Sequence, residues 1–414
     1  MLDGWKRRSL ADLLDFRNGM NFTQASQGER VKVIGVGDFK DKEVLNDFSE
    51  TPSITLNGKV NPDDLLKNDD LLFVRSNGNK ALIGRCVLVS GITEPVSFSG
   101  FTIRGRVKSD EIDHSFASKL VRSPLFKEHL HRMGGGSSIN NLSQDTLSEF
   151  CFSLPPLPEQ RKIAEILRTW DEAIEKLKAV QAAKLRRHRA LTHSLVFGTR
   201  QLDCFRTTDE VVAHRWFTLP ANWGVKPIGK LAREISERNG DTEQHEVLSC
   251  SKYDGFVRSL EYFKKQVFSA DLSGYKKIWR GDFGFPSNHV EEGSIGLQNL
   301  TDVGVVSPIY TVFRFAPEKV DADYAFAVLK TGLYRHIFEV STSASVDRRG
   351  SLRWSEFSKL PFPFPPLAEQ KAIAEVLRTA HTDLDALSTE IEALTRQKRG
   401  LMQKLLTGEW RVRS

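Results

Sequence analysis

The stretch PPLPEQRKIAEILRT, residues 155–169, returns later in the chain as PPLAEQKAIAEVLRT, residues 365–379. The two stretches agree at eleven of fifteen positions, and the offset between them is 365 − 155 = 210 residues. The same offset continues without a gap as far as Gly198 and Gly408. The chain therefore carries an internal repeat of about 44 residues, and a repeat of this kind constrains the whole architecture.

Each copy predicts a long helix. Pro-Pro ends a preceding strand and tolerates the position just before a helix, and apolar residues then recur at alternating steps of three and four, as in a coiled-coil seam. Gly198 and Gly408 stand where a C-terminal cap belongs. We therefore predict two helices of about 40 residues, each roughly 60 Å long. The predicted helix-pairing seam consists of Ile163, Leu167, Trp170, Ile174 and Leu177 in the first copy and Ile373, Leu377, Leu384, Leu387, Ile391 and Leu394 in the second.

A helix with a single apolar stripe needs a partner. We expect the two copies to pair with each other, because two copies on one chain have a high effective concentration; homodimerisation through either helix is the alternative. Polar Gln181, Lys184 and His188 interrupt the first seam, and polar residues at such positions often fix the register. The run 184–190 also fits a solvated helix face.

The segments before the two helices form a second, more diverged pair. Short β-rich runs such as 71–74 and 310–315, broken by Gly and Asn, indicate small sheets. Matching landmarks are Trp5 with Trp223, Asp70 with Asp282, Phe126 with Tyr334, and Phe150 with Phe357.

These features predict an α+β protein with two similar globular domains that contain small mixed sheets. Two long helices that pair as a coiled coil separate the two domains. The predicted boundaries are 1–154 for the first head, 155–200 for the first helix, 201–364 for the second head and 365–414 for the second helix.

Composition narrows the class of protein. The net charge of +6 and the isoelectric point near 9.0 are compatible with a polyanionic partner but do not identify one. No apolar run approaches the roughly 20 residues that span a bilayer, and the first ten residues lack the apolar core of a signal peptide, so we expect a cytoplasmic protein with no membrane partner. Four scattered cysteines without C-x-x-C spacing predict buried free thiols and no metal site.

The order of head, PPL-x-EQ helix, second head and the same helix again resembles the specificity subunit of type I restriction-modification systems, over essentially the whole chain. The resemblance implies that the heads are target-recognition domains, each of which reads half of a bipartite double-stranded DNA sequence. It implies that the two helices pair as an antiparallel coiled coil and that the two heads have a pseudo-two-fold relation. It also implies that the helices set the spacer and dock two DNA methyltransferase subunits, and that two ATP-dependent restriction subunits join through the complex.

We expect the chain itself to have no catalytic residues. No G-x-x-x-x-G-K-[ST] loop is present, because Gly58-Lys59 and Gly229-Lys230 continue with Val60 and Leu231. No Asn-Pro-Pro-aromatic stretch and no glycine-rich S-adenosylmethionine loop is found either. The resemblance implies that S-adenosylmethionine, ATP and Mg²⁺ bind to the partner subunits.

Candidate DNA contacts lie in polar loops of the two heads, which the family commonly presents to DNA. Arg and Asn can pair with guanine and adenine edges, while Ser and Lys suit phosphates; a solvated turn is the alternative for each residue. The candidates are Arg75, Asn77, Lys80, Ser137, Ser138 and Asn140 in the first head, and Lys276, Lys277, Arg280, Asn288, His289, Ser343, Ser345, Arg348 and Arg349 in the second. Of these, we expect Lys276, Lys277 and Arg280 to contact phosphates and not bases.

Two other functions stay open at this point. One is a coiled-coil scaffold whose heads bind proteins or other ligands. The other is a specificity subunit of a type II-like or orphan defence system. The target sequence cannot be derived from the residues, because loop conformation decides which side chains reach which base.

Overall fold

The computed structural model describes residues 4–21, 28–39, 42–56, 59–134, 141–240, 245–252, 255–288, 290–342 and 351–412. The chain divides into two compact units, one made of residues 1–178 with 389–414 and the other of residues 179–388. The division falls inside both long helices, so each unit contains one globular head and a portion of each helix. The predicted boundaries at 154 and 364, which separate heads from helices, stay a prediction.

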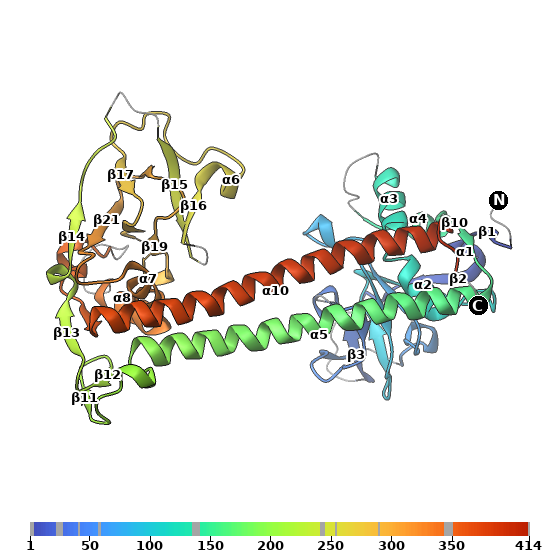
Figure 1. Cartoon of the computed structure of the whole chain (residues 1–414). Helices are drawn as coiled ribbons and strands as arrows, with labels where there is room; N and C mark the ends of the chain where they lie inside the picture. Colours follow the sequence, from blue (N-terminus) through green and yellow to red (C-terminus); the bar gives the residue numbers. More distant parts are fainter. Residues whose placement is uncertain are drawn as a thin grey trace. The chain divides into compact units, whose positions relative to one another are not determined.

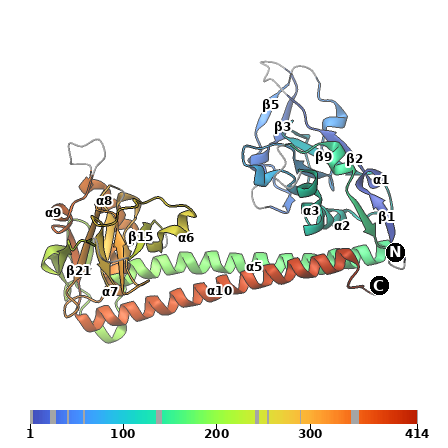
Figure 2. The same ribbon diagram turned by 90° about the horizontal axis from the view of Figure 1, so that it is seen from above.

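The two long helices are α5, Leu157–Val196, and α10, Leu367–Thr407, with 40 and 41 residues. Their predicted length is confirmed. Each helix ends in a left-handed glycine, Gly198 with φ 65° and Gly408 with φ 73°, as the sequence predicts. Figures 1 and 2 show the two helices side by side in each unit.

The helices run antiparallel, and this is evident within each unit taken by itself. In the first unit, Ile163 and Leu167 near the start of α5 share a core with Met402 and Leu405 near the end of α10. In the second unit the order is reversed, because Ile373 near the start of α10 shares a core with residues near the end of α5. The fold class predicted from the repeat is therefore confirmed.

Most of the seam residues are buried. Trp170, Leu177 and Leu394 are half-buried. In the second unit the polar seam residues meet polar partners, because the Gln181 side-chain amide donates to Ser388 Oγ at 2.6 Å and Lys184 Nζ lies 2.6 Å from an Asp383 carboxylate oxygen. The buried members of the predicted seam are Ile163, Leu167, Ile174, Ile373, Leu377, Leu384, Leu387 and Ile391.

The first head contains a five-stranded mixed sheet in the order β2-β9-β6-β7-β4, a three-stranded sheet in the order β5-β3-β8, and the pair β1-β10. Its strands are β1 Lys6–Ser9, β2 Leu14–Asn18, β3 Arg30–Ile34, β4 Val44–Leu45, β5 Ser53–Thr55, β6 Leu71–Val74, β7 Cys86–Val89, β8 Val96–Phe98, β9 Thr102–Val107 and β10 Cys151–Leu154. Its helices are α1 Leu10–Leu13, α2 His114–Leu120, α3 Pro124–Met133 and α4 Gln144–Ser148.

The second head contains two four-stranded sheets, β14-β21-β18-β19 and β16-β15-β20-β17, and the pairs β11-β12 and β13-β22. Its strands are β11 Val211–Ala213, β12 Thr218–Pro220, β13 Gly224–Pro227, β14 Ala232–Ile235, β15 Glu246–Ser251, β16 Gly255–Arg258, β17 Lys276–Trp279, β18 Phe283–Pro286, β19 Gly296–Leu297, β20 Val303–Val306, β21 Tyr310–Phe315 and β22 Pro361–Phe364. Its helices are α6 Ser259–Phe263, α7 Ala322–Leu329, α8 Gly332–Thr342 and α9 Trp354–Phe357.

An ion pair between a buried aspartate and a partly exposed arginine recurs at the same place in both heads. The Asp70 carboxylate accepts two hydrogen bonds of 2.7 Å from Arg106 in the first head. In the second head, Asp282 accepts bonds of 2.5 and 3.1 Å from Arg314. The landmark aspartates of the sequence are therefore structural residues, which join the strand after each of them to a neighbouring strand.

The glutamate of each PPL-x-EQ motif ties its head to the helix. Glu159 accepts a hydrogen bond of 2.9 Å from the Trp5 indole, and Glu369 accepts one of 3.0 Å from the Trp223 indole. Both carboxylates are buried. Strand β1 follows Trp5 and pairs with β10, which leads into α5, so the first and last strands of the head meet where the helix begins.

The glutamine that follows each of these glutamates makes three matched hydrogen bonds. The Gln160 amide donates to Glu111 O and Pro155 O and accepts from Asp113 N, each at 2.8 Å. The Gln370 amide does the same with Lys319 O, Pro365 O and Asp321 N, at 2.9 to 3.1 Å. Asp113 and Asp321 are the N-caps of α2 and α7, so each glutamine fixes the start of a helix in the head.

The third partner of the two glutamates differs between the units. Arg411 donates two hydrogen bonds to Glu159, at 2.8 and 3.0 Å, whereas Gln201 donates one of 3.2 Å to Glu369. Burial alone would raise the pKa of Glu159, but the bonds from Arg411 and Trp5 outweigh it and lower that pKa. Burial raises the pKa of Glu369, because only neutral donors oppose it.

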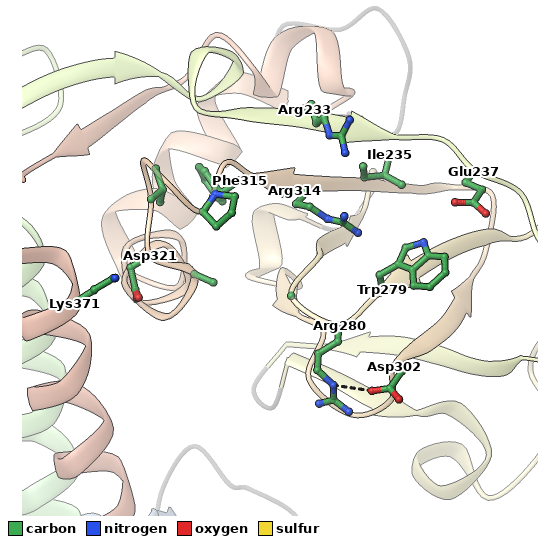
Figure 3. A pocket seen from close by; sticks show the side chains of 14 residues that line it. Arg233, Ile235, Glu237, Trp279, Arg280, Asp302, Arg314, Phe315, Asp321 and Lys371 are labelled. Atoms are coloured by element: carbon green, nitrogen blue, oxygen red, sulfur yellow. Dashed lines mark hydrogen bonds and ion pairs between the residues drawn. The ribbon is translucent and has the colours of Figure 1, made fainter. Parts of the chain in front are cut away.

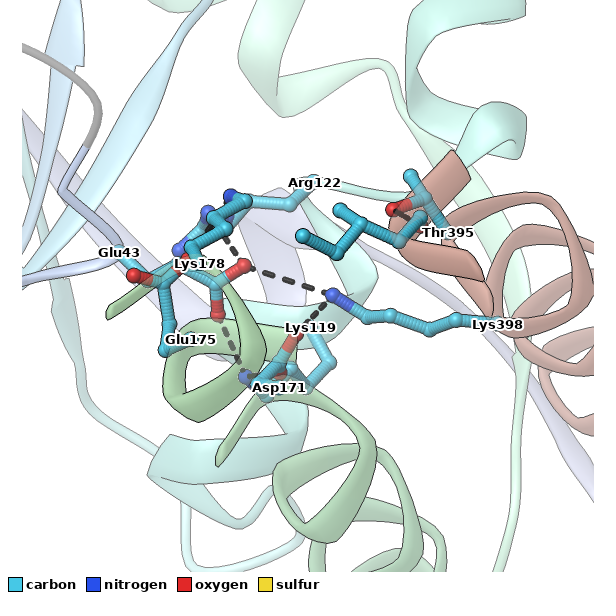
Figure 4. Close-up of polar contacts among 9 residues, drawn as sticks. Glu43, Lys119, Arg122, Asp171, Glu175, Lys178, Thr395 and Lys398 are labelled. Carbon is cyan, nitrogen blue, oxygen red and sulfur yellow. Dashed lines mark hydrogen bonds and ion pairs between the residues drawn. The ribbon is translucent and has the colours of Figure 1, made fainter. Parts of the chain in front are cut away.

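A cluster of charged side chains joins the first head to both long helices (Figure 4). Lys119 contacts Glu43 at 2.9 Å and Asp171 of α5 at 2.5 Å. Lys398 of α10 pairs with Asp171, and Arg122 contacts Glu43 at 2.8 Å. Burial would raise the pKa of Glu43, but Arg122, Lys119 and Lys398 hold it at about 2.

The second unit has a different pair at the positions equivalent to Asp171 and Lys398. His381 and His188 lie 210 residues from these two residues, and their rings face each other at 6.1 Å between centroids. Burial, together with the neighbouring His381, lowers the pKa of His188. The repeat therefore has an ion pair in one unit and a pair of imidazoles in the other.

The prediction that all four cysteines are buried is wrong. All four thiols are free, Cys86 is buried and Cys250 is half-buried, but Cys151 and Cys204 are exposed. Cys151 is an outward-facing residue at the first position of β10. Within the part of the chain that the structure describes, no helix is both long and apolar enough to cross a membrane, and no group of three His, Cys, Asp or Glu could hold a metal ion.

The seam yields a first prediction. Leu387→Asp places a charge at a buried position between the helices, since Leu387 is 8% exposed, and we expect it to lower the free energy of unfolding by roughly 3–5 kcal/mol. Val180→Asp on α5 is the matched control, because Val180 is 46% exposed. Urea denaturation of both variants measures the difference. Equal stability of the two variants would contradict the assigned seam.

A second prediction concerns Glu369. Its raised pKa makes the folded state bind a proton more tightly than the unfolded state, so its contribution to stability falls as the pH rises through the raised pKa. Gln201→Arg supplies the cation that Arg411 gives to Glu159, and we expect a gain of about 1–3 kcal/mol at pH 7. The gain should vanish as the pH falls below the ordinary carboxyl pKa of about 4.

The reverse variant, Arg411→Gln, should lose stability at pH 7 and much less at low pH. Denaturant unfolding of both variants at pH 7 and pH 4 tests the pair. If Gln201→Arg gives the same change in the free energy of unfolding at both pH values, the arginine does not act through the Glu369 carboxylate.

Candidate nucleic-acid interface

The structure places seven of the fifteen candidate binding residues. These seven are Arg75, Asn77, Lys80, Lys276, Lys277, Arg280 and Asn288. The other eight, Ser137, Ser138, Asn140, His289, Ser343, Ser345, Arg348 and Arg349, lie outside the described residues.

In the first head, Arg75 directly follows β6 and is half-buried. Its guanidinium donates to Gly100 O at 3.3 Å, which is in the turn between β8 and β9. Asn77 is half-buried, and its side-chain oxygen accepts from Asn79 N at 2.8 Å, which shapes the next turn. Lys80 is exposed at the start of the 3-10 helix Lys80–Leu82.

In the second head, the three basic candidates do not form one patch. Lys276 is half-buried and donates to Tyr310 O at 2.6 Å, and burial lowers the pKa of its ammonium group. Lys277 lies 3.2 Å from a Glu237 carboxylate oxygen. Successive residues of β17 face opposite sides of the sheet, so neighbours in the sequence are separated in space.

Arg280 lines an open groove of about 940 Å³ in the second unit (Figure 3). Its Nε lies 3.1 Å from an Asp302 carboxylate oxygen, and its Nη1 donates to Asn299 O at 2.5 Å. Basic and acidic side chains line the groove in nearly equal numbers. This balance does not favour the binding of a polyanion in the groove. The charged residues that line it are Arg233, Arg280, Arg314 and Lys371 with Glu237, Asp302 and Asp321.

Arg75 and Ser287 occupy equivalent places, each directly after a central strand of the head. The Arg75 amide donates to Phe101 O at 2.8 Å and its carbonyl accepts from Leu142 N at 2.8 Å. The Ser287 amide donates to Ile309 O at 3.3 Å and its carbonyl accepts from Leu352 N at 2.8 Å. The two heads thus share one backbone framework and present different side chains on it.

Sequence reasoning missed two residues on this framework, Phe101 and Ile309. Phe101 is 63% exposed and Ile309 is 47% exposed, although both side chains are apolar. The only feature of the sequence that could have indicated them is a large apolar residue in a short turn between two predicted strands. Such a residue is easily taken for the end of a buried strand.

The comparisons with known proteins agree with this architecture. A family model described as "Type I restriction modification DNA specificity domain" matches residues 2–184 and 277–396. The chain is 29% identical over 180 residues to the StySPI type I restriction enzyme specificity subunit of Salmonella potsdam. The aligned region covers 42% of this chain and 38% of that protein. It is 22% identical over 397 residues to the type I restriction enzyme MjaVIII specificity subunit of Methanocaldococcus jannaschii. This alignment covers 92% of this chain and 87% of that protein.

Two solved structures share the fold. A chain from a structure described as the structural basis of complex assembly and conformational transition of the type I R-M system aligns with a TM-score of 0.57 at 14% identity, over 99% of each chain. The type I restriction-modification S subunit from M. genitalium aligns with a TM-score of 0.51 at 14% identity, over 97% of this chain and 96% of that one. At these identities the likeness concerns the fold alone.

Proposed function

Because this chain belongs to the family of type I restriction-modification DNA specificity subunits, which are the non-catalytic subunits of their systems, we propose that each of its heads reads one half of a bipartite target in double-stranded DNA. The heads supply two similar binding surfaces for two half-sequences. The four predicted segments, 1–154, 155–200, 201–364 and 365–414, then correspond to reader, spacer, reader and spacer.

The observation that carries this proposal is the shared framework with different side chains. Both heads fix a strand end with matched backbone hydrogen bonds, but the residue at that place is Arg75 in one head and Ser287 in the other. Arg pairs bidentately with guanine, whereas Ser accepts several partners. The two heads share one backbone framework but place different side chains on it. Such heads are suited to bind two different half-sequences.

The proposal assigns the long helices two roles. They set the number of unread base pairs between the half-sites, and they dock two DNA methyltransferase subunits, through which two ATP-dependent restriction subunits join the complex. S-adenosylmethionine, ATP and Mg²⁺ then bind to those partner subunits.

We predict that the purified chain alone neither methylates nor cleaves duplex DNA, because its sequence lacks the phosphate-loop and methyltransferase motifs. Incubation with S-adenosylmethionine, or with ATP and Mg²⁺, followed by methylation and cleavage assays, tests this. Addition of the methyltransferase subunits should restore adenine methylation. Activity that co-purifies with the single chain through rigorous fractionation would contradict the assignment.

A further prediction separates the roles of heads and helices. Insertion of four residues after Gln181 lengthens α5 by about 6 Å and adds a net turn of about 40°. We expect the two half-sequences to stay the same while the unread spacer changes by one or two base pairs, since a base-pair step is about 3.4 Å. A four-residue insertion after Thr207, in an exposed loop, is the matched control and should change neither.

Exchange of residues 1–154 for the first head of another family member should alter one half-sequence and leave the spacer alone. Methylome sequencing of cells that carry each variant with its methyltransferase subunits reads both quantities. The division of labour is wrong if the insertion in α5 rewrites a half-sequence, or if the exchanged head changes only the spacer.

A further inference from the structure

Each head carries a four-residue turn between two strands, and the two turns are equivalent. Ser99–Thr102 follows β8 and leads into β9, and the Thr102 amide donates to Ser99 O at 2.9 Å. Ser307–Tyr310 follows β20 and leads into β21, and the Tyr310 amide donates to Ser307 O at 3.0 Å. The third residue of each turn is Phe101 or Ile309, the large apolar residue that sequence reasoning missed.

These turns are held firmly from within the head. In the first head, Thr102 Oγ1 donates to Ser99 O at 2.7 Å and the Gly100 amide donates to Met20 O at 2.8 Å. In the second head, Ser287 Oγ donates to Ile309 O at 2.7 Å. Because these hydrogen bonds fix the backbone, the turn itself has little main-chain freedom to lose on binding.

Phe101 and Ile309 lie outside the hydrophobic cores of their heads. Phe101 is 63% exposed and Ile309 is 47% exposed, so neither contributes much to a core. A single exposed apolar residue on a protein surface is ordinary. Here, however, both heads place one at the same position of the same turn, although the rest of their sequences has diverged.

A cation lies against each turn. Arg75 donates to Gly100 O at 3.3 Å, and Lys276 donates to Tyr310 O at 2.6 Å. A basic group beside a rigid apolar tip suits duplex DNA, because the cation attracts the phosphate backbone while the apolar group contacts a base. Apolar side chains read the thymine methyl group in the major groove or insert between base steps.

We propose that Phe101 and Ile309 are specificity-determining residues that contact bases of the DNA target, one in each half-site. The inference rests on the proposed function, since it requires that the heads read DNA. Phe101 presents a flat ring that packs on the face or the methyl edge of a base, and Ile309 presents a branched aliphatic group that packs on a thymine methyl. Their different shapes then favour different bases on a common framework.

The test uses the chain assembled with its methyltransferase subunits. Methylome sequencing of the wild type supplies the target, and three duplexes serve as probes: the intact target and two versions with one half-site scrambled. We expect Phe101→Ala to weaken binding to the intact target on the order of tenfold. The salt dependence should not change, because no charge is removed. One half-sequence of the methylome should become degenerate.

Ile309→Ala should have the same kind of effect on the other half-sequence. Phe101→Leu should retain part of the affinity, because it keeps apolar volume at the tip. Val44→Ala and Leu300→Ala are the matched controls, since these exposed apolar residues, 40% and 39% exposed, lie in other elements of the first and second heads. Thermal unfolding of every variant shows whether the head is still folded.

The outcomes separate this inference from the proposed function. If the wild-type complex reads a bipartite sequence and the folded Phe101→Ala and Ile309→Ala variants keep its affinity and its methylome, the inference is wrong and the function stands. Equal losses in the control variants would also overturn the inference. A wild-type complex without sequence preference would overturn the proposed function, and this inference with it.

Discussion

A buried glutamate at the start of each long helix, which accepts a hydrogen bond from a tryptophan indole of the head, is the contact on which the rest of each unit depends. Glu159 holds Trp5 and Glu369 holds Trp223. The glutamine that follows each glutamate fixes a helix of the same head through its N-cap residue. Because a buried carboxylate without partners is costly, these contacts define one arrangement of head on helix, and the sheets are built outward from it.

The two copies of this arrangement have kept their geometry while their charges have diverged. Glu159 has the cationic partner Arg411, whereas Glu369 has neutral Gln201, so the pKa of one carboxyl is lowered and that of the other is raised. The same contrast appears along the seam, where an ion pair in one unit corresponds to two histidines in the other. The arrangement of head on helix is the same in both units, because both helices must still pair. The partners can differ, because a buried polar group requires only that its hydrogen bonds be satisfied.

The strand ends and turns that carry Arg75, Ser287, Phe101 and Ile309 follow the same logic. Matched backbone hydrogen bonds position a strand end and a turn, and the side chains on them differ between the heads. A framework held by main-chain atoms tolerates substitution of the side chains that it presents, because the hydrogen bonds do not depend on them. The two heads therefore keep one backbone framework while the side chains that it presents differ.

The sequence by itself determined the repeat and the two helices with their lengths and glycine caps, because periodicity and capping are local properties of the chain. It left open whether each helix pairs with its copy or with a second chain, and the tertiary structure decided that the two copies pair. The sequence also showed which catalytic motifs are missing. It could not show that Glu159 meets Trp5, 154 residues away, or that Lys276 donates to Tyr310 O while Lys277 pairs with Glu237, or that Phe101 and Ile309 occupy equivalent turns. Those contacts join residues far apart in the chain, and strand register and turn geometry, which only the tertiary structure supplies, decide which side chains meet and which stay exposed.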